Sequence, residues 1–261
     1  MRRRDLRQAS DEEHSERVML HLGEMNLLEY DPDVFRRLND FSIARDELER
    51  RVQDVTRLGN VITEYGLESS VGINLIHKHF DLADDELVLR EFEGDAAFMR
   101  PKRARECRGH LPYLWKLDRG ASGRGWYPLE FVQPLPEHHI DARAEIETIR
   151  AAVEFLDALA DCVEELELAD LFGIVSLASR RPFELDSETT LLETTDEVGR
   201  VLTLRRTPRD ALETMDTTKT LWVFSSGRDR RMTAGAQCVS HCISHCHGHV
   251  LQRPDVPSGS L

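Results

Sequence analysis

Val71-Gly-Ile-Asn-Leu-Ile-His-Lys-His-Phe-Asp-Leu82 resembles Phe172-Gly-Ile-Val-Ser-Leu-Ala-Ser-Arg-Arg-Pro-Phe-Glu-Leu185, a segment about 100 residues further along the chain. The matched positions are Gly72 with Gly173, Ile73 with Ile174, and Phe80-Asp-Leu82 with Phe183-Glu-Leu185. A long helical pattern precedes each segment. Self-similarity at this spacing indicates an internal duplication.

Helical and strand-like patterns alternate on either side of these two segments. Apolar residues recur at helical spacing over residues 11–66 and 140–168. Strand patterns occur at residues 71–80, 87–92, 113–117, 126–132, 171–178, 190–194, 201–205 and 221–225. The predicted fold class is therefore α+β, with two duplicated helix-plus-antiparallel-strand units, N-terminal helices and a Cys/His-rich C-terminal segment. The predicted divisions are an N-terminal helical region leading into the first repeat (1–66), a first β unit (67–136), a second helix-plus-β unit (137–226), and a linker with a Cys/His-rich tail (227–261).

The composition of the 261 residues is that of a folded, acidic protein, with 40% hydrophobic residues, 31% charged residues and a formal net charge of -14. This charge repels nucleic-acid phosphate and anionic lipid, so neither is an expected partner, whereas a protein partner or a homo-oligomer stays open. The basic start Met1-Arg-Arg-Arg leads into acidic residues, and no apolar stretch approaches the roughly 20 residues that span a bilayer. Five cysteines without a secretion signal predict reduced thiols and a cytoplasmic location.

The C-terminal segment carries seven thiol or imidazole groups within twelve positions, from Cys238 to His249. Thiolate sulfur and imidazole nitrogen are donors that zinc and copper(I) prefer. If the segment is helical, one face presents five predicted ligands to zinc, or to copper as the second choice: Cys238, His241, Cys242, His245 and Cys246. The spacing differs from the usual zinc-finger pattern, so the alternative is a tail whose donors are incidental.

His77 and His79 form a second candidate metal site. Strand alternation would place both imidazoles on the same side of residues 71–80. Glu86 or Glu91 is the expected third ligand or general base. The corresponding positions of the second segment lack histidine, so the imidazoles are not needed to build the repeated fold, and a packing role for them is the alternative.

The order Gly72, His77, His79, Glu86 and Gly94 resembles the first motif of the cupin family. The resemblance implies a metal held by two histidines and a glutamate inside a β-barrel. A second cupin motif, with a Pro-x-Gly turn and a later histidine, is missing from residues 99–132, and the gap between His79 and Glu86 exceeds the usual one. Together with the repeated helices, these differences favour the α+β fold over a barrel.

Three further features have weaker functional interpretations. A basic cluster could hold a carboxylate or phosphate but is typical of a solvated loop: Arg100, Lys102, Arg103, Arg105 and Arg108. The Gly-rich residues 120–125 lie between two strands, which predicts a hairpin loop instead of a phosphate-binding loop. Two donor pairs, Cys107 with His110 and His138 with His139, lack diagnostic spacing.

No nucleophile elbow, Walker loop, dinucleotide fingerprint or metalloprotease motif occurs, so the sequence does not decide whether the chain is an enzyme.

The leading functional hypothesis is an intracellular zinc-binding protein whose biochemical role is open. The alternatives are a metal-dependent enzyme with an open site at His77 and His79, and a non-catalytic scaffold that binds a partner. If the C-terminal segment folds back over the first repeat, its donors and the two histidines would complete one site, with ligand atoms within about 5 Å of each other. The polar linker 225–231 would also let the segment lie elsewhere.

Overall fold

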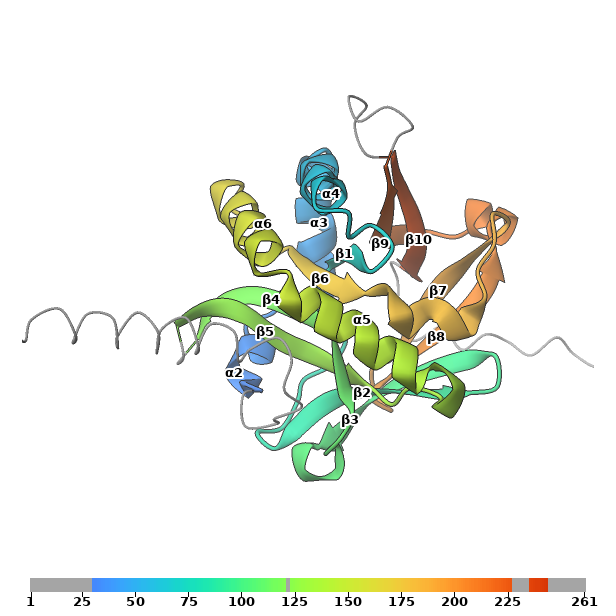
Figure 1. Ribbon diagram of the computed structural model, residues 1–261. Coiled ribbons are helices and arrows are strands. Elements are labelled where there is room, and N and C mark those ends of the chain that lie inside the picture. Colours follow the sequence, from blue (N-terminus) through green and yellow to red (C-terminus); the bar gives the residue numbers. More distant parts are fainter. Residues whose placement is uncertain (1–29, 121–122, 227–234, 244–261) are drawn as a thin grey trace, which may run out of the picture.

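Ten strands form a closed barrel of mixed parallel and antiparallel pairs (Figure 1). The computed structural model describes residues 30–120, 123–226 and 235–243. Around the barrel the strands follow the order β1 (Val71–Leu75), β6 (Phe172–Ser176), β4 (Leu111–Gly120), β5 (Gly123–Val132), β2 (Glu86–Glu93), β3 (Ala96–Arg103), β8 (Val201–Pro208), β7 (Thr189–Asp196), β10 (Gly235–Ile243) and β9 (Thr217–Ser225). The ring closes where β9 pairs with β1, with Trp222 opposite Ile73.

Helices lie on the outside of the barrel. Helix α5 (His139–Ala151) packs against β4, and α4 (Asp54–Glu64) packs against α6 (Val153–Glu165), β1 and β9. Helix α2 (Pro32–Arg36) contacts β5, and α3 (Phe41–Arg51) lies between α2 and α4 in the chain. The start of α2 follows from its sequence, because the Asp31 carboxylate accepts a hydrogen bond from the Asp33 amide at 2.9 Å and Pro32 occupies the first turn.

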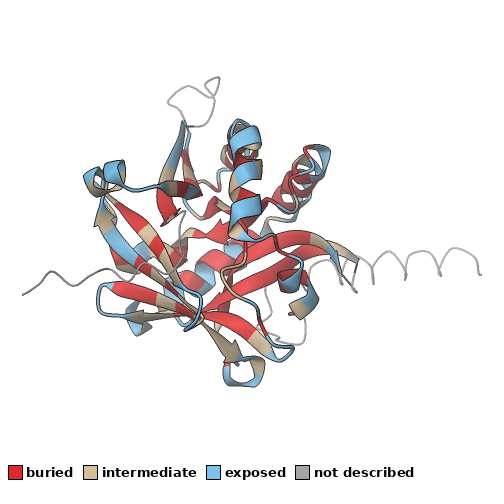
Figure 2. Cartoon of the chain, turned by 180° about the vertical axis from the view of Figure 1, so that it is seen from behind, coloured by how far each residue is buried: buried red, intermediate tan, exposed pale blue. Residues whose placement is uncertain are grey.

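The apolar stripe predicted over residues 140–168 is buried against the barrel, but it belongs to two helices instead of one. They meet at Ala152, whose backbone leaves helical geometry (φ -84, ψ 59). Ile149 of α5 and Leu159 of α6 are almost fully buried, and the Trp126 indole of β5 donates a hydrogen bond to the Leu156 carbonyl at 3.3 Å. Buried residues dominate the covered strands, and exposed residues lie on the outer faces of the helices (Figure 2).

The predicted α+β fold of two duplicated helix-plus-strand units is wrong, because strands from both halves of the chain form one closed barrel. The two similar segments that prompted the prediction supply β1 and β6, which are direct neighbours and pair antiparallel with Ile73 opposite Ile174. Their shared glycine has a packing reason. A Cβ atom at Gly173 would lie 2.5 Å from the Trp115 carbonyl oxygen, and one at Gly72 would lie 2.8 Å from the Trp222 carbonyl oxygen.

The helix proposed for the Cys/His-rich segment is also wrong over its described part. Residues 235–243 form strand β10, which pairs antiparallel with β9 and parallel with β7. The physical reason is that β7 and β9 would otherwise present open edges, and an added strand satisfies the backbone groups of both. His245 and Cys246 lie outside the described residues.

Strands β4 and β5, which flank residues 121–122, pair antiparallel up to Gly120 and Gly123. The hairpin prediction is therefore confirmed.

Among the described residues, no helix has the length and apolar character needed to cross a membrane.

Candidate metal centre

Four potential metal ligands converge at one point of the structure. His77, His79, Glu193 and Cys242 each offer one ligand atom, and these atoms all lie within 4.8 Å of one another. The two histidines follow the end of β1, Glu193 belongs to β7, and Cys242 belongs to β10. His77, Glu193 and Cys242 are buried, and His79 is partly exposed. The barrel thus brings together groups that are up to 165 positions apart in numbering, from His77 to Cys242.

Hydrogen bonds orient both imidazoles. His77 Nδ1 lies 3.0 Å from the Leu75 carbonyl oxygen, and because a carbonyl only accepts, Nδ1 must carry the proton. The lone pair of His77 is then on Nε2, which is buried without a hydrogen-bond partner within the described residues. His79 Nδ1 lies 2.8 Å from the Thr195 hydroxyl. Histidines that bind metals are commonly held in this way through the other ring nitrogen.

Glu193 is held by two hydroxyl groups. Its Oε1 accepts a hydrogen bond from Thr220 Oγ1 at 2.9 Å and another from Ser240 Oγ. Burial raises the pKa of Glu193, and these two hydrogen bonds act in the opposite direction. Both hydroxyls bond the same oxygen, so Oε2 is the carboxylate atom available to an ion.

The electrostatic environment keeps the two imidazoles neutral. Burial lowers the pKa of His77 to about 4, and the hydrogen bond to Leu75 only partly offsets this effect. Burial also lowers the pKa of His79 well below its usual value, and the neighbouring His77 ring, whose centroid is 4.4 Å away, adds to the shift. Neutral imidazole is the form that coordinates a metal, so no proton has to leave these rings near pH 7.

The four groups lie between an interior cavity and an open cleft. The cavity, of about 30 Å³, is lined by His77, His79 and Glu193 among others. The cleft, of about 650 Å³, is lined by His79 and Cys242 together with residues of the 78–81 loop, α3 and β7. His79 borders both spaces. An ion could therefore reach the donors from the cleft, which is also large enough for a small-molecule ligand.

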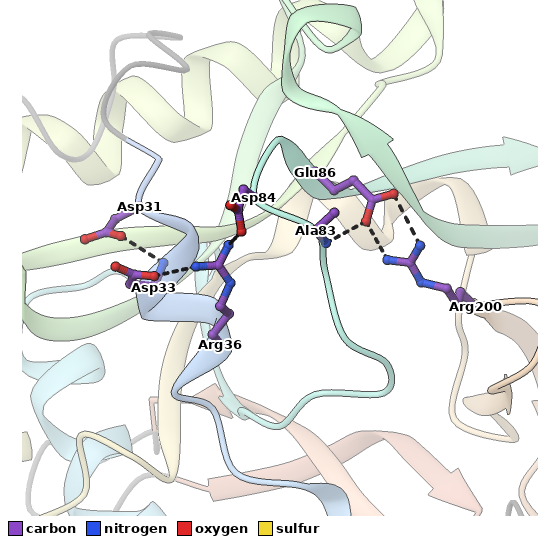
Figure 3. A network of polar contacts seen from close by, with 7 residues as sticks. All are labelled: Asp31, Asp33, Arg36, Ala83, Asp84, Glu86 and Arg200. Carbon is purple, nitrogen blue, oxygen red and sulfur yellow. Dashed lines mark hydrogen bonds and ion pairs between the residues drawn. The ribbon is translucent and has the colours of Figure 1, made fainter.

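Glu86, one of the two expected third ligands, has a different role. It forms an ion pair with Arg200 and accepts a hydrogen bond from the Ala83 amide at 2.8 Å (Figure 3). The Arg200 hydrogen bond lowers the pKa of Glu86. Arg36 binds Asp84 on the other side of the same loop. These contacts hold the chain that follows His79, so Glu86 supports the rim of the cleft and does not join the four donors.

Glu91, the other expected third ligand, pairs with Lys102 at 3.1 Å and with Arg100 at 3.7 Å. Two residues of the basic cluster are thus partly neutralised by a carboxylate of the neighbouring strand.

Cys107 is buried in a small apolar cluster with Leu87, Leu89 and Phe131. His110 and His139 line a separate open pocket, away from the four donors.

The C-terminal donors are divided between two places. Cys242 lies beside His77 and His79. This proximity is the one expected if the C-terminal segment folds back over the residues that follow β1. Cys238 and His241 instead contact each other, with 3.6 Å between Sγ and Nε2, and His241 Nδ1 lies 3.3 Å from the Thr190 hydroxyl. Alternation along a strand and two register shifts in β10 separate donors that a helix would have kept on one face.

Glu193 is the donor that sequence reasoning missed. A signal for it was present in β7, whose sequence is Thr-Thr-Leu-Leu-Glu-Thr-Thr-Asp. Glu193 is two residues from Leu191, so both side chains point to the same face of the strand. Leu191 is 1% exposed, and the Glu193 carboxylate therefore lies on the buried face of β7. Such a position requires hydrogen-bond donors or a cation.

The fold and these donors define a closed mixed β-barrel with a candidate His/His/Glu/Cys metal centre beside an open cleft. A scan of protein-family models gave no match to this chain, and searches of curated proteins and of solved structures found no similar protein.

Proposed function

We propose that the chain binds one zinc ion through His77, His79, Glu193 and Cys242. The observation that supports this proposal is the convergence of four donor atoms within 4.8 Å, from three separate parts of the barrel. Imidazole, carboxylate and thiolate are all zinc ligands, and four of them form the usual tetrahedral sphere at about 2.0–2.3 Å. Small movements of the side chains would bring the donors to these distances.

Charge balance supports the same assignment. A divalent ion bound by two neutral imidazoles, one carboxylate and one thiolate has no net charge, which suits a buried position. Without an ion, the barrel buries a carboxylate and a thiol where apolar side chains would pack at lower cost. The carboxylate is a hard oxygen donor, so the set favours zinc over copper(I), which prefers sulfur.

Metal analysis of the full chain, purified without added metal, tests the proposal. We expect about one zinc per chain in the parent and less than about a tenth of that in His77→Ala and in Cys242→Ala, because each variant removes a ligand from a four-ligand sphere. His241→Ala and Cys238→Ala are matched controls from the same strand, since these residues contact each other and not the four donors. Equal zinc content in the ligand variants and the parent would contradict the proposal. A paired change of His245 and Cys246 to Ala shows whether those donors contribute.

A metal-dependent enzyme is the second candidate function, and the open cleft favours it. His79 and Cys242 line a space of about 650 Å³, within the range of small-molecule sites. Four protein ligands are typical of a structural centre, whereas a catalytic centre keeps one position for water or substrate. A smooth surface without an enclosed polar pocket would favour the scaffold alternative, whereas the barrel has a cavity with histidine, glutamate and arginine side chains in its wall.

Cobalt substitution distinguishes the structural centre from the catalytic one. If four protein groups fill the coordination sphere, the visible spectrum of the Co²⁺-loaded protein is expected to show tetrahedral coordination and to stay unchanged when azide is added. A spectrum that changes on titration with azide would indicate an open position and favour the enzyme. Cys242→Ala in excess Co²⁺ is the positive control, because this variant lacks one of the four protein ligands.

A further inference from the structure

The interior cavity carries two arginine side chains in its wall. Arg90 comes from β2, and Arg180 comes from the 3-10 helix Leu177–Phe183 that follows β6. Arginine is rarely buried unless an anion or a set of acceptors satisfies it. Arg90 is buried and Arg180 is partly buried, so the N–H groups that both direct into this small cavity require acceptors.

Among the described residues, Arg90 forms only long hydrogen bonds. It is 7% exposed, its guanidinium stacks over the Tyr113 ring at 4.1 Å, and its nearest acceptors are the Ser179 carbonyl at 3.5 Å and the Met99 sulfur at 3.6 Å. Both contacts are long for hydrogen bonds to a charged donor. The Nε atom of Arg90 is buried without a partner among the described residues.

Arg180 is less satisfied than Arg90. Within the described part of the chain it forms neither a hydrogen bond nor an ion pair, and its Nε atom is buried. Burial, together with the nearby charge of Arg90, lowers the pKa of Arg180 to about 10. The guanidinium nevertheless remains charged at pH 7, so two positive charges face the same cavity.

Two carboxylates of the described residues line the same cavity, but neither accepts a hydrogen bond from an arginine. Glu130 and Glu193 are the carboxylates that line it. Glu193 is oriented by Thr220 and Ser240 and lies among the four metal donors, so a bound metal would offset its charge. Glu130 accepts a hydrogen bond from the Tyr113 hydroxyl, not from either arginine. The guanidinium N–H groups facing the cavity are therefore left without a strong acceptor among the described residues.

We infer that this cavity is a binding site for a small carboxylate, held by the guanidinium groups of Arg90 and Arg180. The N–H groups of a guanidinium match the two oxygens of a carboxylate in a bidentate pair. The cavity volume of about 30 Å³ restricts the ligand to a few non-hydrogen atoms, the size of formate. Neither arginine belongs to the four metal donors, so the inference goes beyond the proposed zinc site and does not depend on it.

Calorimetric titration of the full chain with formate, in buffer without chloride or other carboxylates, tests the inference. A ligand of three non-hydrogen atoms is expected to bind with a Kd near 1 mM at best. Arg180→Met should weaken formate binding by at least about tenfold, because it removes a charge-assisted hydrogen-bond donor. Arg205→Met is the matched control, since Arg205 is exposed on β8. Pivalate, which is a bulkier carboxylate, should not bind.

The outcomes separate this inference from the zinc proposal. Formate binding by both zinc-loaded and chelator-treated protein, lost in Arg180→Met and kept in Arg205→Met, supports the inference whether or not zinc binds. No heat of binding at about 100 mM formate, equal affinity in Arg180→Met and parent, or equal binding of pivalate would overturn it. The zinc content and urea midpoint of Arg180→Met show that the variant is folded, so that lost formate binding is a local effect.

Discussion

Glu193→Gln is expected to weaken zinc binding by at least about 100-fold while the metal-free barrel stays as stable as the parent or becomes more stable. Changes to residues that only orient a metal ligand cost about 10–100-fold in affinity, and loss of an anionic ligand costs more. The glutamine carbonyl can still accept the hydrogen bonds of Thr220 and Ser240. The neutral amide also avoids burying a carboxylate in the metal-free protein.

Two measurements on the same samples check this expectation. Zinc affinity is measured by competition with a chromophoric chelator, and the free energy of unfolding is measured by urea titration in the presence of EDTA. Glu197→Gln is the matched control, because Glu197 lines the same cleft outside the four donors. A Glu193→Gln variant that keeps parental zinc affinity, or that loses stability without metal, would assign Glu193 a structural role instead.

Glu130→Gln is expected to stabilise the protein above neutral pH and to have little effect near pH 4.5. Burial raises the pKa of Glu130 to about 7, although Arg90 and the Tyr113 hydrogen bond act against this shift. Between the ordinary pKa of about 4.5 and about 7, the folded protein therefore binds more protons than the unfolded chain. The contribution of Glu130 to stability falls as pH rises through this window and levels off above it.

The size of the effect follows from the shift in pKa. A displacement of this size corresponds to a loss on the order of 3 kcal/mol between pH 4.5 and pH 8. Glutamine has no such titration and can still accept the Tyr113 hydroxyl, so the variant should lack this loss. Urea unfolding of parent and variant across pH 4.5 to 8 measures the difference, in which the contributions of other groups cancel. Parallel stability curves would show that Glu130 titrates in its ordinary range.

Part of the candidate donor set could be predicted from local sequence. His77 and His79 are two positions apart, and the structure places their rings next to each other, although β1 ends at Leu75 and the histidines lie just beyond it. Cys242 was recognised as a donor because of its neighbours in sequence, not because of its neighbours in space. Glu193 was missed because a single acidic residue in a strand has no spacing signature.

The global fold could not be predicted, for a physical reason visible in β1 and β6. Apolar periodicity reports which side chains are buried, and it located the helices and most strands. It does not report which strand pairs with which, because backbone hydrogen bonds are the same for any partner. Two similar segments with a close-approach glycine are compatible with two separate units and equally with two neighbours in one sheet, and the structure contains the second arrangement.

Residue chemistry and periodicity were thus sufficient to point to candidate metal ligands, to apolar helices and to short strands. The composition of the ligand set depends on barrel closure. Cys242 and Glu193 lie beside the two histidines only because β10 inserts between β9 and β7. Cys238 and His241, from the same strand, contact each other instead. Strand pairing joins segments that are more than a hundred residues apart, and the register of the pairing decides which face of the sheet each side chain occupies. Neither the partner strand nor the register can be read from the local spacing of residues.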